Sequence, residues 1–198
     1  SFYGNKTITT GEGGMLVTNY KNIFENAKIM RSHGMRPQKR YWHDVIGYNY
    51  RMTNLQAAVG LAQMENINKI IKQKRKMSEF YNSEIKKLNK KINYKIIIPY
   101  FNKKNVNSYW LYNIRIDKIN SVRRDSIIKL LDRKGINTRN FFYPLSSMRI
   151  YKKYCKFSYP VSNKLSESGL CLPSSPNLSK KQAKYIIVEL FNAIKTLP

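Results

Sequence analysis

The sequence predicts a mixed α/β protein, in which residues 1–90 are part of one domain and residues 91–198 form a small α+β domain. Two patterns support this division. Apolar residues recur at helical spacing from position 53 to about position 88. Further along the chain, apolar side chains alternate as in a half-buried strand, at Trp110, Tyr112, Ile114 and Ile116.

The first 52 residues are expected to form a loop, a strand and a helix. The apolar run MLVTN at 15–19 predicts the strand, and YKNIFENAKIMRSHG at 20–34 predicts a helix that ends before Gly34. Residues 35–52 are aromatic and basic without a clear period, which indicates an ordered loop.

Later elements follow from capping signals and periodicity. Thr53 and Gln56 have the spacing of a capping box, so a long helix should begin there, with room for one break before residue 88. The segments 94–99, 109–117 and 136–145 predict strands, and 122–135 predicts an amphipathic helix that Gly135 ends. Residues 159–179 are rich in turn formers and indicate a loop, and a second capping box at Ser179 and Gln182 predicts a final helix.

The net charge of +26, from 37 Lys and Arg against 11 Asp and Glu, would attract nucleic acid or anionic membranes. The basic residues are spread over the whole sequence without an arginine–aromatic repeat, so we assign them to solvated helix faces and expect no nucleic-acid partner. A basic nucleic-acid-binding module remains the alternative from another functional class. No apolar run approaches the roughly 20 residues of a membrane span, so no membrane partner is expected.

Cysteine and histidine are too few and too widely spaced for a zinc site. Cys155 and Cys171 lie 16 positions apart, and the two histidines, His33 and His43, form no paired ligand spacing with them. We therefore expect neither a metal nor a disulfide, and reduced thiols are typical of a cytoplasmic protein. The opening residues have the character of the middle of a structured segment, so the sequence is expected to be part of a longer chain.

Lys6 lies between a small-residue turn and a glycine cluster, in SFYGNKTITTGEGG. A phosphate-binding loop places its lysine after the glycines, whereas this lysine precedes them, so the glycines predict a tight turn that leads into a strand. A deprotonated lysine can form an imine with an aldehyde or ketone, and short neighbours such as Gly4 leave room for a flat ring. Lys6 is therefore a candidate nucleophile, with a structural lysine as the alternative.

Two long motifs resemble the PLP-dependent sugar-nucleotide aminotransferases of the DegT/DnrJ/StrS group. They are SFYGNKTITTGEGGMLVTN at 1–19 and RYWHDVIGYNYRMTNLQAAVGLAQME at 40–65, and the later segments 138–145 and 159–179 also match. The resemblance corresponds to the C-terminal half of such an enzyme. It implies a type I (aspartate aminotransferase-like) PLP fold, with the end of the large PLP-binding domain and its connecting helix in residues 1–90.

The resemblance also implies roles for individual residues. Lys6 would form the aldimine with pyridoxal 5'-phosphate and then act as general acid and base. Ser1 would help to hold the cofactor phosphate. Asn49 would reach the cofactor phosphate of the partner subunit, so the active site would be shared within a homodimer; the alternative is a turn-forming asparagine. Arg51 either pairs with an anionic group of the donor or nucleotide, or braces its loop.

In the small domain, Arg139 and Tyr143 fall where the family closes over the sugar nucleotide, and we expect both to contact substrate. The sequence departs from the family at Ser146, near which a histidine is common. No residue of the chain is assigned the aspartate that pairs with the pyridine nitrogen, so residues 1–198 alone are expected to be inactive.

The function implied for the complete protein is transamination of a nucleotide-linked keto sugar, with glutamate as amino donor. We expect the reaction at C4 of a GDP-linked 4-keto-6-deoxyhexose. A UDP- or dTDP-linked keto sugar is the alternative substrate. An inactive remnant, or one half of a split enzyme, also remains open.

Overall fold

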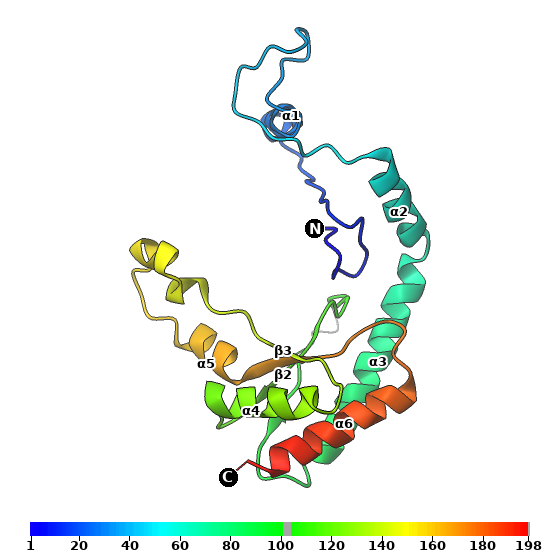
Figure 1. Ribbon diagram of the computed structural model, residues 1–198, viewed down its shortest axis with the longest axis vertical. Helices are drawn as coiled ribbons and strands as arrows, with labels where there is room; N and C mark the ends of the chain where they lie inside the picture. Colours follow the sequence, from blue (N-terminus) through cyan, green and yellow to red (C-terminus); the bar gives the residue numbers. More distant parts are fainter. Residues whose placement is uncertain (101–103, 198) are drawn as a thin grey trace. The chain divides into compact units, whose positions relative to one another are not determined.

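The computed structural model describes residues 1–100 and 104–197 and consists of two compact units (Figure 1). The first unit is Ser1–Lys69 and the second unit is Ile70–Pro198. The division lies ahead of the boundary that we expected near residue 90. The reason is that most of α3 (Ile67–Leu88) belongs to the second unit, where Met77, Tyr81 and Ile85 join the hydrophobic core.

The first unit contains α1 (Lys21–Met30) and α2 (Asn54–Glu65), and neither helix has a buried residue. The strand expected at residues 15–19 does not form, so that prediction was wrong. A strand needs a neighbouring backbone to accept and donate its hydrogen bonds, and no strand of the described residues pairs with this segment. The loop after α1 is ordered as predicted, with antiparallel bridges from Ser32 to Asn49 and from Met35 to His43.

The long helix predicted from Thr53 to about residue 88 is confirmed as two helices, α2 and α3, which are separated by Asn66. The capping box at its start is also confirmed. The Gln56 N–H donates to Thr53 Oγ1 at 3.2 Å, and the Thr53 N–H donates to Gln56 Oε1 at 2.9 Å. These two bonds satisfy backbone donors that the first helical turn leaves without partners.

The second unit is built on an antiparallel four-stranded sheet in the order β1-β2-β4-β3. Its strands are β1 (Ile96–Ile97), β2 (Tyr112–Ile116), β3 (Arg139–Asn140) and β4 (Gly169–Leu172). The alternation predicted for β2 is observed, because Tyr112, Ile114 and Ile116 are each at most 1% exposed.

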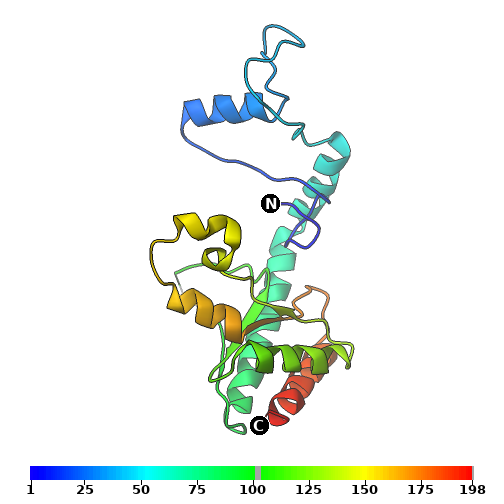
Figure 2. The same cartoon turned by 60° about the vertical axis from the view of Figure 1, so that its left-hand side comes forward.

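Helices α4 (Ser121–Asp132) and α6 (Lys180–Lys195) pack against each other and lie below the sheet in Figures 1 and 2. Both contribute side chains to the hydrophobic core. Both have N-terminal caps: Asn120 Oδ1 accepts from the Arg123 N–H, and Ser179 forms the predicted second capping box with Gln182. Two short 3₁₀ segments, η1 (Leu145–Ser147) and η2 (Arg149–Tyr154), follow β3.

The loop expected at residues 159–179 is largely wrong, because this segment contains α5 (Pro160–Ser168) and β4. Proline is favourable at the first helical position, where its missing N–H costs no hydrogen bond. All four residues of β4 are buried between β2 and β3. The serines that suggested a loop are instead small polar residues of a buried helix end: Ser166 is 7% and Ser168 is 2% exposed.

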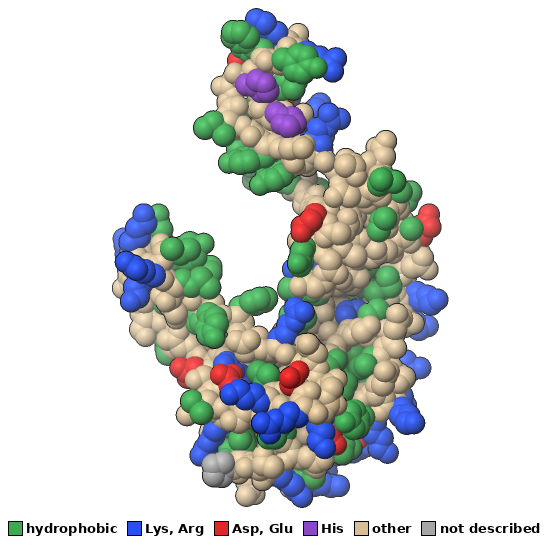
Figure 3. Space-filling model, in the orientation of Figure 1, with side chains coloured by type: hydrophobic (Ala, Val, Ile, Leu, Met, Phe, Trp, Pro, Cys, Tyr) green, Lys and Arg blue, Asp and Glu red, His purple; other side chains and the backbone are tan. Residues whose placement is uncertain are grey.

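Lysine and arginine side chains are scattered over the face shown in Figure 3, in agreement with the spread of basic residues along the sequence. In residues 1–100 and 104–197, no helix combines the length and the apolar character needed to cross a bilayer.

Candidate functional site

The turn that carries Lys6 is the central part of a closed loop, residues 2–13. The loop closes because the Phe2 N–H donates to Gly13 O and the Thr10 N–H donates to Phe2 O, both at 2.9 Å. Within it, the Lys6 N–H donates to Tyr3 O at 2.9 Å. Lys6 is half-buried. The predicted nucleophile therefore lies in a tight, hydrogen-bonded turn.

Ser1 is exposed and is hydrogen-bonded to the same turn. Its Oγ accepts from the Tyr3 N–H at 3.4 Å, while Tyr3 O accepts from Lys6, so Tyr3 links the two predicted cofactor contacts. A Cβ built on Gly4 would have no atom within 4 Å, which leaves open space beside the turn. An amine, a hydroxyl and unobstructed backbone in one turn fit the aldehyde and phosphate of pyridoxal phosphate.

The closed loop rests on α2 through glutamine side chains that sequence analysis did not assign to the site. Gln63 Oε1 accepts from the Thr9 N–H at 3.0 Å, and Gln63 Nε2 donates to Thr9 O at 2.8 Å. Gln56 Nε2 donates to Glu12 O at 3.3 Å. The spacing of Gln56, Gly60 and Gln63 places all three on one helix face, a pattern that identifies the contact only once the loop is known to pack against α2.

The second motif lies next to the same loop. Its residue Met52 reaches Gly13, where an added Cβ would stand 2.9 Å from Met52 Cε. Asn49 and Arg51 are both exposed, and Asn49 pairs through its backbone with Ser32. The structure therefore brings the two sequence motifs together through Met52, and it leaves the side chains of Asn49 and Arg51 on the surface of the first unit.

The predicted substrate contacts belong to the second unit. Arg139 is an exposed residue of β3, paired with Cys171 of β4, and Tyr143 is 64% exposed. Burial raises the pKa of the Cys171 thiol to about 11, and the positive charge of Arg139 acts in the opposite direction. Ser146, at the departure from the family pattern, lies in η1.

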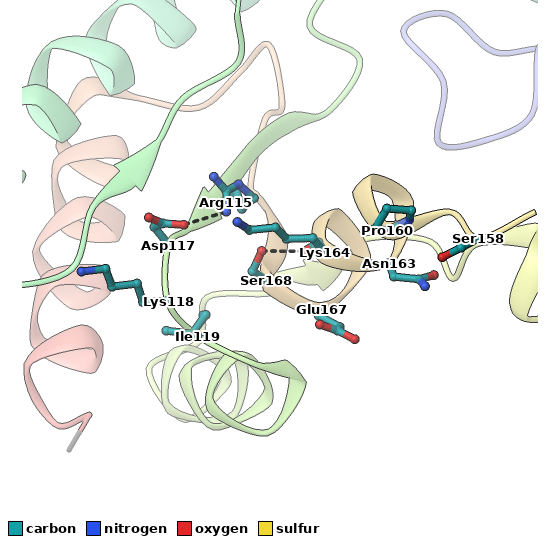
Figure 4. A pocket seen from close by; sticks show the side chains of 10 residues that line it. All are labelled: Arg115, Asp117, Lys118, Ile119, Ser158, Pro160, Asn163, Lys164, Glu167 and Ser168. Atoms are coloured by element: carbon teal, nitrogen blue, oxygen red, sulfur yellow. Dashed lines mark hydrogen bonds and ion pairs between the residues drawn. The ribbon is translucent and has the colours of Figure 1, made fainter.

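A surface cavity of about 710 Å³ lies elsewhere in the second unit (Figure 4). The Arg115 guanidinium donates to Asp117 Oδ1 at 2.9 Å, and this hydrogen bond holds the pKa of that carboxyl below its ordinary value. The positive charge of Lys164, from α5, lowers the same pKa. None of the predicted site residues lines it; the lining consists of Arg115, Asp117, Lys118, Ile119, Ser158, Pro160, Asn163, Lys164, Glu167 and Ser168.

Comparison with known proteins assigns the chain to a family. Residues 1–191 match the model of the DegT/DnrJ/EryC1/StrS aminotransferase family. The chain belongs to this family. It is 42% identical over 196 residues to the GDP-perosamine synthase of Vibrio cholerae, a match that covers 98% of this chain and 51% of that protein. It is 41% identical over 187 residues to the GDP-perosamine synthase of Escherichia coli O157:H7, covering 94% and 48%.

Solved structures of aminotransferases confirm the predicted type I PLP fold. An aminotransferase of Helicobacter pylori involved in the biosynthesis of pseudoaminic acid superposes with a TM-score of 0.86 at 24% identity, over 100% of this chain and 53% of that one. A putative sugar aminotransferase of Streptococcus pneumoniae in its PLP form gives 0.82 at 22% identity, over 98% and 50%. The cofactor predicted from the sequence is thus the one named for a structural relative. The chain spans about half the length of the relatives it matches.

Proposed function

We propose that the complete protein transfers an amino group from glutamate to C4 of a nucleotide-linked 4-keto-6-deoxy sugar. GDP-4-keto-6-deoxy-mannose, which would give GDP-perosamine, is the substrate that we place first. The observation that carries this proposal is the identity of 41–42% to two GDP-perosamine synthases, over 94–98% of this chain.

The chemistry would be divided between the cofactor and a few residues of this chain. When bound, pyridoxal phosphate supplies an electron sink for the negative charge that develops at carbon. Lys6 would hold the cofactor aldehyde through Nζ, and as a free amine it would take up and return the proton at Cα of the donor. Ser1 Oγ would hold the cofactor phosphate. In the second unit, Arg139 and Tyr143 would contact the sugar nucleotide.

We further propose a homodimer in which Asn49 reaches the cofactor phosphate of the partner subunit, while Arg51 pairs with an anionic group or braces the loop. Exposed large apolar side chains of the first unit support this proposal, because apolar surface is commonly covered where protein chains associate. Those at least half exposed are Tyr3, Met15, Leu16, Val17, Tyr20, Phe24, Tyr41, Trp42, Val45, Ile46, Tyr50, Leu55, Leu61 and Met64.

Reductive labelling tests the proposed role of Lys6 directly. The full-length gene product would be incubated with pyridoxal phosphate and reduced with borohydride, and the pyridoxyl group would be located by peptide mass. We expect a single label on Lys6, which Lys6→Arg removes although it keeps the positive charge. A matched variant, Lys21→Arg, changes an exposed lysine of α1 and should label like the wild type. Labelling elsewhere, with Lys6 unmodified, would contradict the proposal.

The nucleotide can be identified separately by comparing kcat/KM for GDP- and UDP-linked 4-keto-6-deoxy sugars with glutamate as donor. We expect the GDP-linked substrate to be preferred. A preference for the UDP-linked sugar would contradict the proposed GDP-linked substrate, while the proposal that the protein is an aminotransferase would stand.

A further inference from the structure

The side-chain amide of Gln63 forms two hydrogen bonds with the backbone of the closed loop that carries Lys6, as a neighbouring strand would do with an edge strand. Its oxygen accepts from the Thr9 N–H and its nitrogen donates to Thr9 O, at 3.0 and 2.8 Å. One half-buried side chain therefore satisfies both backbone groups of a residue 54 positions earlier in the chain. Such a two-bond contact fixes the direction of the backbone as well as its position.

Packing next to this contact is close. Thr10 is 7% exposed, and a Cβ on Gly60 would lie 2.8 Å from Thr10 Cγ2. A helix residue larger than glycine at this position would push the loop away from α2. One turn earlier on the same face, Gln56 Nε2 donates to Glu12 O at 3.3 Å. We call Gln56, Gly60 and Gln63 the glutamine seat.

The hydrogen bonds of the glutamine seat are important for the position of the loop, because the described part of the first unit has no apolar core that could hold it. Among the described residues, every buried hydrophobic side chain belongs to the second unit. Hydrogen bonds must therefore fix the loop. The Gln63 amide is bonded to the backbone of Thr9, the Thr10 N–H donates to Phe2 O, and the Lys6 N–H donates to Tyr3 O. The glutamine seat is therefore connected to the turn that carries the lysine.

We propose that Gln63 is a positioning residue, whose amide holds the closed loop so that the Lys6 amine points at the cofactor aldehyde. This inference rests on the proposed function of Lys6. In this proposal Gln63 acts on the lysine indirectly, through Thr9 and the closed loop.

The test uses the full-length protein and three variants. Gln63→Leu removes both hydrogen bonds at nearly the same volume. Gln63→Glu keeps the acceptor for the Thr9 N–H, and only its protonated form can donate to Thr9 O. Gln73→Leu is the matched control, because Gln73 is an exposed glutamine of α3. Backbone amide exchange over residues 2–13 is measured by mass spectrometry without cofactor, and the Kd for pyridoxal phosphate and the Lys6 labelling rate are measured with it.

We expect Gln63→Leu to raise amide exchange in residues 2–13 about tenfold, and to weaken cofactor binding and slow labelling by a similar factor. Gln73→Leu should match the wild type in all three. For Gln63→Glu, the ratio of its exchange rate to that of the wild type should fall from pH 8 to pH 5, because protonation restores the second donor. A general loss of folding would not produce this pH profile.

The outcomes separate the two claims. If the wild type carries no label on Lys6, the proposed function fails. If the wild type is labelled at Lys6 and Gln63→Leu shows wild-type exchange, affinity and labelling, the positioning role of Gln63 is overturned and the function stands. A pH-independent defect in Gln63→Glu would likewise overturn it, because the proposal requires the donor to Thr9 O.

Discussion

The two units of this chain differ in what holds their backbones in place. In the part of the second unit that the structure describes, 20 hydrophobic side chains are buried in one cluster between Met77 and Ile194. The first unit has ordered turns, two helices and the Lys6 loop, yet its buried side chain among the described residues is a threonine, Thr10. The second unit therefore specifies its fold by packing, whereas the first depends on hydrogen bonds and leaves an apolar surface of the kind that other protein segments cover.

The largest expected effect comes from truncating one core residue and one matched exposed residue. Ile127 of α4 is 0% exposed, and Ile127→Ala should lower the free energy of unfolding by about 2–5 kcal/mol, through lost burial and a cavity. Ile46 of the first unit is 84% exposed, and Ile46→Ala should change it by less than about 0.5 kcal/mol. Urea unfolding of both variants checks this. If both variants lost the same unfolding free energy, the claim that only the second unit is held by a packed core would be wrong.

Alkaline pH should destabilise the second unit specifically. Burial raises the pKa of Cys171 from 9.0 to about 11, and burial also raises the pKa values of Tyr81 and Tyr112 above the ordinary range. Each group is neutral when protonated, so its stabilisation is complete below the unfolded pKa and is lost as the pH rises toward the folded one. For Cys171 the loss amounts to about 2–3 kcal/mol by pH 11.

The measurement is the unfolding free energy between pH 8 and pH 11, in the wild type and two cysteine variants. Cys171→Ala should flatten the decline above pH 9. Cys155→Ala should not, because Cys155 is only partly buried and lies outside the core cluster. An identical slope in Cys171→Ala and wild type would show that the buried thiol does not contribute.

A smaller effect compares two equivalent helix caps. Ser179 begins α6 in the second unit and Thr53 begins α2 in the first, and both form complete capping boxes. Ser179→Ala should lower the unfolding free energy of the second unit by about 1 kcal/mol. Thr53→Ala should leave that transition unchanged and raise amide exchange at the start of α2. If Thr53→Ala shifted the transition as much as Ser179→Ala does, the units would not be independent.

The smallest effect concerns the exposed pair Arg36 and Asp44 in the first unit. The hydrogen bond from Arg36, at 2.6 Å, lowers the pKa of the Asp44 carboxyl. Because the folded pKa is depressed, the contribution is present above the unfolded value and disappears as the pH falls through the folded one. Arg36→Ala should raise the Asp44 pKa, observed by NMR titration, and leave unfolding of the second unit unchanged. Arg40→Ala is the matched control.

Local signals in the sequence predicted most helices correctly, because capping boxes and 3.6-residue periodicity act within a few residues. Both boxes, at Thr53 and Ser179, occur as expected. The errors arose where distant contacts decide. Residues 15–19 have the composition of a strand, but no described strand pairs with them. β4 lies in a segment whose serines and prolines suggested turns.

The candidate site was predicted from motifs and remains a set of proposals for Lys6, Ser1, Asn49, Arg51, Arg139 and Tyr143. Gln63 was overlooked because a polar residue on a helix ordinarily faces water. Its partner Thr9 lies 54 residues earlier, and no pattern in the sequence links the two. Spacing on α2 becomes informative only once the loop is known to pack there.

The strand order of the second unit also has a consequence for biosynthesis. Of the four strands of this sheet, β4 is the last to be translated, yet it pairs with both β2 and β3, which cannot complete the sheet without it. Closing these pairings requires long chain segments to be brought together, which is slow compared with forming local helices. On the ribosome, α3 and α4 should therefore remain without a closed core until β4 and α6 have emerged, and nascent chains halted before β4 should be sensitive to proteases and bound by chaperones.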